Sequence, residues 1–422
     1  MSEAFEEGCD WESAKLVSIH VEEILDVIKR FSDFKKHVID YNTIITEGLN
    51  ETISVDKKQI IRNTKWAETK NMEMIFSGPH VFVANPYYKT PREQCILNSD
   101  YDIIDLSTLS GSYSARTNYI PNIPISDFRN LFVGFYKGQG TDGVVYDDWF
   151  SYYKAAIIPP NSAHIGGVVS VTFDNYDDLV EFSGCCSSTI WDFYVKILKI
   201  SDVRINRINS FPLGIADKYK PSLFARTLLL NCLTTAYSDL WQEMWDAAYK
   251  QETWSIDDPR LKPFDQLHED WAWDIPLRNY FERRQALVEI DVIAAMALGL
   301  TLEDLEMIYT IQFPVLQQNE ADTWYDQKGN IVFTCSKGLT GVGLDRKRNT
   351  KTGMLGWEDI RGEQIEENTY AGTSPTHTHT IDPAKSELYG GQQVTYYAPY
   401  TKCDRIEDYR RAWAHFEKVF NK

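Results

Sequence analysis

The chain has 422 residues, 43% of them hydrophobic and 25% charged, which is the composition of a globular protein with room for two or three domains. Its 43 Lys and Arg stand against 61 Asp and Glu, and the net charge of −18 excludes a uniformly basic surface for nucleic acid. No apolar run approaches the roughly 20 residues that span a bilayer. The acidic residues 2–10 are also unlike a secretory signal, so we expect a cytoplasmic protein without a membrane anchor.

The first element that the pattern predicts is one long helix over residues 10–48. Apolar residues recur along it at spacings that alternate between three and four, as in a helix that packs on another helix. This seam can pack on the chain's own domain or dock on a separate partner. Its candidate docking residues are Val17, Val21, Ile24, Ile28 and Phe31.

Residues 74–213 then predict short strands separated by Gly, Pro, Asn and Asp turns, which is typical of a compact α+β domain. Asp174 and Asn175 are the expected start of a helical stretch over about 176–197. The strands are expected at 74–76, 80–83, 155–158 and 168–171.

Residues 203–209 alternate apolar and polar side chains except at the adjacent pair Asn206-Arg207, and this pattern predicts a further strand with a polar face. Arginine pairs with guanine and asparagine with adenine through two hydrogen bonds, so such a face suits base recognition. A solvated edge strand is an equally weighted alternative. The polar residues are Arg204, Asn206, Arg207 and Asn209.

The second half of the chain is predicted to be largely helical. Helices are expected over 223–249 and 276–298, and Gly299 ends the second of them. Thr301 is the expected N-cap of the next helix. The run 404–407 resembles a capping box ahead of a terminal helix.

A short strand over 331–334 precedes a loop rich in glycine and basic residues, 336–353. The glycines of 338–343 are the one candidate for a cofactor loop, but the polar residues after them lack the helical period that such a loop requires. We favour a flexible basic loop that contacts phosphates over one that is merely solvated. Its cations are Arg346, Lys347, Arg348 and Lys351.

Metal and catalytic sites have weaker support. Residues 377–379 place two imidazoles side by side, but no Cys, Asp or Glu follows at a matching short spacing, so we expect a loop without a metal. The seven cysteines show no ligand spacing either, which indicates reduced thiols. Glu181, Asp192 and Lys196 fall on predicted helix, which does not suit a nuclease.

A further signal lies in residues 83–92, which can also be interpreted simply as a strand followed by a proline-stiffened turn. Asn85-Pro86-Tyr87-Tyr88 matches three of the four positions of the Asn-Pro-Pro-Tyr/Phe run with which N6-adenine methyltransferases hold a flipped base. Its context resembles the C-terminal target-recognition region of large S-adenosylmethionine-dependent N6-adenine DNA methyltransferases of restriction–modification and phage-defence systems. The likeness continues in order through residues 101–106, 116–121, 158–160, 164–165, 191–196, 281–291, 314–318, 324–327 and 411–417.

In that family the catalytic domain and its cofactor loop lie upstream of the resembling region. The resemblance therefore implies a DNA-specificity subunit with no catalytic residues and no cofactor of its own, bound to a methyltransferase subunit that holds S-adenosylmethionine. The N-terminal helix takes the place of the covalent link, so we expect it to dock on that subunit. Beyond the groups named above, contacts to double-stranded DNA are expected from Tyr87, Tyr88, Lys89, Arg92, Arg116, Asn118 and Tyr119.

We therefore expect an α+β chain of three parts: a helical arm 1–72, a mixed-strand recognition domain 73–215 and a mostly helical domain 216–422. The charge of −18 requires cations gathered on one face, or a partner that supplies most phosphate contacts. Two alternatives stay open. One is a self-sufficient permuted adenine methyltransferase that uses residues 85–88 and 338–343; the other is an acidic protein-interaction module of a phage-defence assembly.

Overall fold

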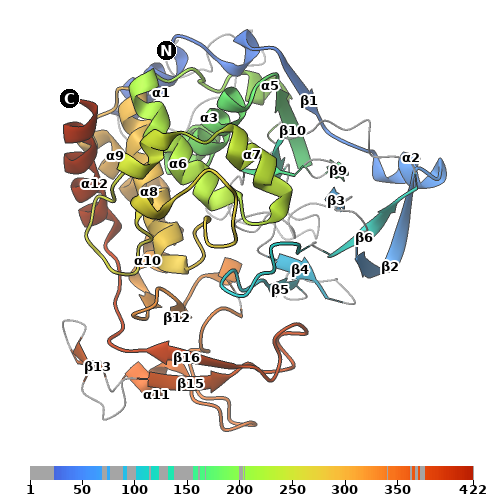
Figure 1. Cartoon of the computed structure of the whole chain (residues 1–422), viewed down its shortest axis with the longest axis vertical. Helices are drawn as coiled ribbons and strands as arrows, with labels where there is room; N and C mark the ends of the chain where they lie inside the picture. The colour runs from blue at the N-terminus through green and yellow to red at the C-terminus, as the bar shows by residue number, and fades with distance from the viewer. Residues whose placement is uncertain are drawn as a thin grey trace.

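The computed structural model combines helices and strands, as the α+β expectation requires (Figure 1). Its helices are α1 (Glu23–Ser32), α2 (Glu51–Asp56), α3 (Tyr176–Cys186), α4 (Thr189–Ile197), α5 (Ile205–Asn209), α6 (Lys220–Asn231), α7 (Ser238–Glu243), α8 (Tyr280–Ala297), α9 (Leu302–Gln312), α10 (Pro314–Ala321), α11 (Trp357–Ile360) and α12 (Arg405–Phe420). The residues that the structure describes are 23–68, 74–76, 89–92, 101–113, 116–122, 132–136, 155–159, 162–166, 168–198, 203, 205–339, 341–361, 364–365, 369–370 and 376–421.

The strands pair almost entirely as antiparallel neighbours. A four-stranded sheet has the order β1-β10-β7-β8, and smaller pairs join β2 to β6, β4 to β5, β11 to β12 and β15 to β16; β3 and β9 are parallel. Their bounds are β1 (Thr43–Thr46), β2 (Ile60–Glu68), β3 (Met74–Phe76), β4 (Lys89–Pro91), β5 (Tyr101–Ile103), β6 (Arg116–Pro121), β7 (Phe132–Tyr136), β8 (Ala155–Ile158), β9 (Ser162–His164), β10 (Val168–Phe173), β11 (Thr323–Tyr325), β12 (Ile331–Thr334), β13 (Gln364–Ile365), β14 (Thr369–Tyr370), β15 (Thr376–Thr380) and β16 (Gln393–Tyr397).

Helices cover the four-stranded sheet in successive layers. Helix α3 packs on β7, β8 and β10, α6 packs on α3, and α8 lies between α6 and α12. Helices α3 and α6 approach closely at Gly184, because a Cβ at this position would clash with the side chains of Leu223 and Thr227. Most side chains of α8 are buried, including several charged ones. The sequence of this helix therefore reads as a core element and not as an amphipathic surface helix.

The predicted helix over 10–48 is wrong beyond Ser32, where α1 ends. The backbone then leaves the helical path because it pairs with a distant segment: the Val38 N–H donates to the Phe211 carbonyl, and the Leu213 N–H donates to the Lys36 carbonyl. Strand β1 follows and pairs with β10. Long-range pairing has overridden a local helical pattern here.

Two other long helices are interrupted. The stretch 176–197 divides into α3 and α4, because Ser188 accepts a hydrogen bond from the Trp191 N–H and caps a new helix. The stretch 223–249 divides after α6, which ends at Asn231. The predicted ends that depend on local caps are confirmed: Asn175 caps α3, Thr301 and Asp304 form a capping box on α9, and Gly299 has φ +72° after α8.

The predicted parts 1–72, 73–215 and 216–422 all contribute to the largest hydrophobic cluster of the core. This cluster contains Phe31, Trp191, Trp241 and Phe416, which come from all three ranges. A second, smaller cluster holds together β12, α11 and β16 at the opposite end of the molecule (Figure 1). Within the described residues, no helix has the length and apolar character needed to cross a membrane.

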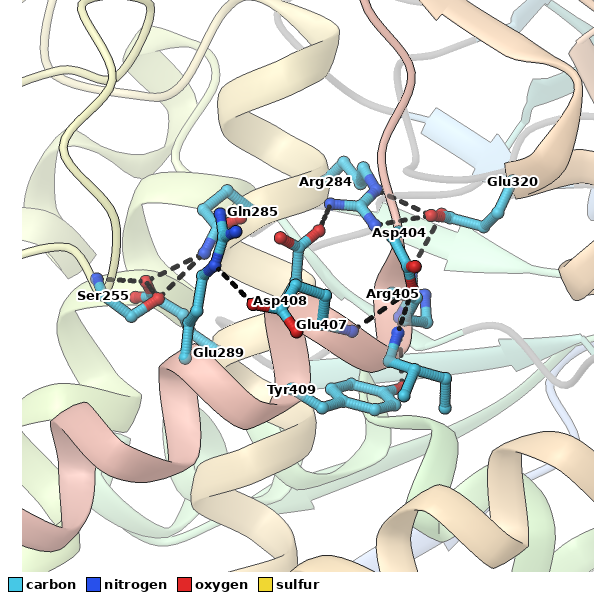
Figure 2. Close-up of polar contacts among 12 residues, drawn as sticks. Ser255, Arg284, Gln285, Glu289, Glu320, Asp404, Arg405, Glu407, Asp408 and Tyr409 are labelled. Atoms are coloured by element: carbon cyan, nitrogen blue, oxygen red, sulfur yellow. Dashed lines mark hydrogen bonds and ion pairs between the residues drawn. The ribbon is translucent and has the colours of Figure 1, made fainter. Parts of the chain in front are cut away.

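A network of buried charges fastens α10 and α12 to α8 (Figure 2). Glu320 of α10 accepts hydrogen bonds from Arg284 at 2.5 Å and from Arg405 at 3.1 Å. Arg284 also pairs with Asp408 at 2.7 Å, and Arg405 pairs with Asp291 at 2.9 Å. Each buried charge meets an opposite one, so the network is a structural element of the core, although Arg405 Nε has no hydrogen-bond partner within the described residues.

A neighbouring network attaches α6 to α8. Arg226 is fully buried and binds Glu289 at 2.6 Å and Glu252 at 2.7 Å. Ser255 and Gln285 donate further hydrogen bonds to Glu289 (Figure 2). These polar groups bind one another, so this cluster is also part of the core, although Gln285 Oε1 has no hydrogen-bond partner within the described residues.

Candidate nucleic-acid interface

The basic loop 336–353 is a structured connection between β12 and α11. Its two ends are fixed by backbone hydrogen bonds, from Leu344 to Val332 and from Trp357 to Asp345. Asn349 shapes the turn, since its side chain accepts the N–H groups of Lys351 at 3.0 Å and of Thr352 at 3.2 Å. The predicted basic loop is therefore confirmed as a loop, and its cations lie at the surface.

The two arginines of the loop are engaged by carboxylates. Arg346 pairs with Asp322 at 2.6 Å and stacks over the Phe333 ring at 4.7 Å. Arg348 pairs with Asp359 at 3.2 Å. The pKa of Asp359 is lowered mainly by the hydrogen bond that its carboxylate accepts from the Gly356 N–H, and Arg348 lowers it further.

Two lysines of the loop, Lys347 and Lys351, differ from the arginines in their contacts. Lys347 and Lys351 are exposed, and neither pairs with a carboxylate in the part of the chain that the structure describes. Their two ammonium groups are open to the solvent. The loop can thus offer positive charge to an anionic partner although the whole chain is acidic.

Strands β15 and β16 form a two-stranded ribbon beside this loop. Residues 377–379 were expected in a loop, and this expectation is wrong: they lie in β15 and pair with β16. On one face of the ribbon, Val394 and Tyr396 pack against Trp357 and the rest of the small cluster. His377 pairs with Tyr396 and His379 with Val394 across the ribbon. Burial lowers the pKa of the His379 imidazole, and the nearby His377 lowers it further.

The other face of the ribbon is polar and uncharged. Thr376, Thr378 and Thr380 are exposed, whereas the two histidines between them are half-buried. Their cross-strand partners are Tyr397, Thr395 and Gln393. The hydroxyls of Thr378 and Thr395 lie 3.1 Å apart.

The connection between the two strands, residues 381–392, is held from both sides. On one side Lys385 forms an ion pair with Asp345 at the start of the basic loop. On the other, Asp102 of β5 accepts the N–H groups of Glu387 at 3.0 Å and Leu388 at 3.2 Å. Asp102 is 2% exposed, so its contacts replace the water that a carboxylate normally binds.

This junction accounts for two of the predicted DNA contacts. Arg92 donates to Asp102 at 3.2 Å, and Arg116 lies 3.7 Å from Glu387. Their side chains are only 23% and 14% exposed. Both arginines therefore brace the ribbon against β4–β6, and the structure brings them together with a segment nearly 300 residues away in sequence.

The other predicted contacts of this region are either buried elsewhere or outside the described residues. Tyr119 is 5% exposed in a separate cluster, and its burial raises its pKa, so its ring is not available to stack on a base. Lys89 and Asn118 lie in β4 and β6, but their side chains are outside the described residues. Tyr87, Tyr88 and Arg204 also fall outside them.

The predicted strand 203–209 is wrong, because residues 205–209 form α5. In a helix, alternate residues do not share a face. Ile208 is fully buried while Ile205 is 43% exposed, and Arg207 is half-buried with a pKa that burial lowers. Asn206 is exposed and Asn209 half-buried. Helix α5 also lies at the opposite end of the molecule from β15 and β16 (Figure 1).

The predicted docking residues belong to the chain's own core wherever they are described. Ile24 and Phe31 are 1% and 0% exposed, and Ile28 packs against the same cluster. This arrangement matches the alternative in which the helix packs on its own domain, because side chains buried here cannot meet a partner. Val17 and Val21 lie outside the described residues.

The glycine run 338–343 does not form a cofactor cradle. Strand β12 pairs with β11 in an antiparallel hairpin and is followed by a single turn of 3-10 helix, Lys337–Leu339. Gly343 then brings the chain back against the Val332 carbonyl. A dinucleotide-type loop requires a helix directly after the glycines, and here the next helix begins at Trp357.

The described residues contain no cluster of three or more His, Cys, Asp or Glu side chains that could hold a metal. Cys185, Cys186 and Cys232 are buried free thiols, and burial raises the pKa values of Cys185 and Cys232. The sequence matches no protein-family model, and no curated protein aligns with it significantly. The candidate interface therefore rests on its own geometry.

Proposed function

We propose that the chain is a non-catalytic DNA-recognition subunit of an N6-adenine DNA methyltransferase complex in restriction–modification or phage defence. The methyltransferase partner would bind S-adenosylmethionine and transfer the methyl group, and this chain would select the site on double-stranded DNA. The observation that carries the proposal is the exposed basic loop, which places Lys347 and Lys351 beside a polar ribbon at one end of an acidic chain. The resemblance of residues 83–92 and of the segments after them points to the same function.

The acidic composition is compatible with this role because phosphate contacts are local. A few lysines can neutralise the phosphates that they touch, while acidic residues elsewhere weaken binding in any other orientation. The loop arginines can also exchange Asp322 and Asp359 for phosphates, since exposed ion pairs contribute only about 0–1 kcal/mol.

Lys347→Ala combined with Lys351→Ala is expected to weaken binding to every duplex, whatever its sequence. Each lost phosphate contact reduces the slope of log K against log salt by about 0.9, so the slope should fall by roughly 2. Anisotropy of a fluorescent duplex in a salt titration measures both effects. The titration uses the chain purified from its host together with any subunit that copurifies with it.

The matched control is Lys250→Ala with Lys418→Ala, which removes the same charge from two exposed positions on the helical side. An equal loss in both double variants would mean that only net charge matters. No change in the loop variant would remove the loop from the interface.

Deletion of the gene tests the proposal as a whole. The expected result is the loss of one N6-methyladenine sequence motif from the host genome, read by methylation-sensitive sequencing. An unchanged methylome would contradict the proposed function and favour a role in protein interaction.

A further inference from the structure

The ribbon of β15 and β16 has the dimensions of an element that reads the major groove of DNA. Each strand has five residues, which extend about 17 Å at roughly 3.4 Å per residue. The major groove of B-DNA is about 12 Å wide and admits a two-stranded ribbon. The ribbon also lies at the end of the molecule, away from the helical layers (Figure 1).

The outward face of the ribbon has the chemistry that base edges require. Thr378, Thr380 and Gln393 are exposed and carry hydroxyl and amide groups without net charge. Glutamine pairs with adenine through two hydrogen bonds, and threonine can bond to a base edge or contact the thymine methyl. The strands contribute no charged side chain to this face, and Lys328 lies over the Tyr397 ring at its edge, with the ammonium 4.1 Å from the ring centre.

The inward face makes the ribbon rigid. Val394 and Tyr396 are packed with Trp357, and Asp102 and Lys385 fix the connection between the strands. Base readout depends on such support, because a side chain must be held within a fraction of an ångström of its partner. The ion pair of Lys385 with Asp345 also sets the basic loop beside the ribbon.

We propose that the ribbon enters the major groove and reads bases through Thr378, Thr380 and Gln393, while Lys347 and Lys351 contact the flanking phosphates. This inference rests on the proposed function and deepens it by naming the element that selects the sequence. It replaces the segment 203–209 as the base-reading element, since residues 205–209 form a helix and not the strand expected there.

The test is the host gene carrying Thr378→Val, Thr380→Val and Gln393→Met, changes that keep shape and remove hydrogen-bonding groups. The methylated motif is expected to relax or change at one or more positions, with an about 10- to 100-fold loss of preference at each. Thr310→Val with Gln251→Leu, at exposed sites on the helical side, is the matched control and should leave the motif unchanged.

The outcomes separate the two levels of the proposal. If gene deletion leaves the methylome intact, the proposed function fails and the ribbon inference fails with it. If deletion removes a motif but the ribbon variant methylates the same motif with the same preference, only the ribbon inference is overturned. If the variant loses all methylation, a second variant with only Thr378→Ser and Thr380→Ser decides, because serine keeps the hydroxyl groups. Methylation of the natural motif by this second variant supports readout by the hydroxyls, and loss of methylation contradicts it.

Discussion

Replacing Glu320 with alanine is expected to lower the free energy of unfolding by about 3–5 kcal/mol, because it leaves two buried arginines without their shared carboxylate. Arg284 and Arg405 are 7% and 6% exposed, so water cannot take the place of the lost partner. Helices α10 and α12 should both loosen from α8 in this variant (Figure 2). Chemical denaturation followed by circular dichroism measures the change.

The control is Arg411→Ala, which removes an ion pair with Glu407 one turn away on the surface of α12. Its arginine is 54% exposed, and such a pair contributes only a few tenths of a kcal/mol. Similar losses in the two variants would show that the buried network has no special weight in the stability of the chain.

The Glu320 carboxylate should also make the free energy of unfolding sensitive to acid. Burial by itself would raise the pKa of Glu320, but Arg284 and Arg405 outweigh it and lower the pKa to about 2 from its usual 4.5. The lowered pKa stabilises the fold above pH 4.5, and this contribution of about 3 kcal/mol is lost as the pH falls towards 2. Denaturation midpoints across this window should therefore drop less in Glu320→Gln than in the natural chain.

Phe31→Ala is expected to destabilise the chain on its own by about 3–5 kcal/mol, the range for removal of a buried ring. Phe31 is fully buried, stacks on Tyr194 at 4.5 Å and meets Trp191 edge-on at 5.7 Å. Thermal or urea unfolding of the purified chain measures the loss. Ile39→Ala, at a position that is 67% exposed, should change stability by less than about 0.5 kcal/mol.

The Phe31→Ala variant also distinguishes the two interpretations of the N-terminal helix, docking on a partner and packing on its own domain. If the ring served mainly to dock on a partner, its removal would leave the isolated chain as stable as before and weaken only the complex. The packing of Phe31 on α4 predicts the reverse: the isolated chain loses stability first.

Features set by local chemistry were predictable from the sequence. Thr301, Asn175 and Gly299 mark helix ends because caps act within one turn of the chain. Strand β12 was predicted with its observed bounds, since a short run of apolar residues is bounded by turns on both sides. The basic loop was predicted for the same reason.

Features set by distant contacts were not predictable in this way. Residues 33–48 have a helical pattern, but pairing with 211–213 and with β10 determines their structure. Residues 203–209 have a strand-like pattern up to Asn206, but residues 205–209 form a short helix in which Ile208 is buried. Neither partner segment can be identified from the local pattern alone.

The ribbon was missed because its outward residues are threonines, which are common in loops. One signal was present: Thr and His alternate strictly from Thr376 to Thr380, and polar and apolar residues alternate again from Gln393 to Tyr396. Period-two patterns on either side of a Gly390-Gly391 turn are typical of a hairpin. Arg92 and Arg116 were predicted as DNA contacts from a resemblance, and their ion pairs give them a bracing role that only the fold could show.

The hydrogen bonds between Asp102 and the connection of β15 to β16 determine how this surface can be re-engineered. Two stretches of chain, 101–103 and 381–392, form one mechanical unit although they are far apart in sequence. A hairpin transplanted alone from another protein would leave the Asp102 carboxylate buried without the amides that it binds. Grafts of new specificity into this scaffold must therefore carry both stretches together, or replace Asp102 with a neutral residue at the same time.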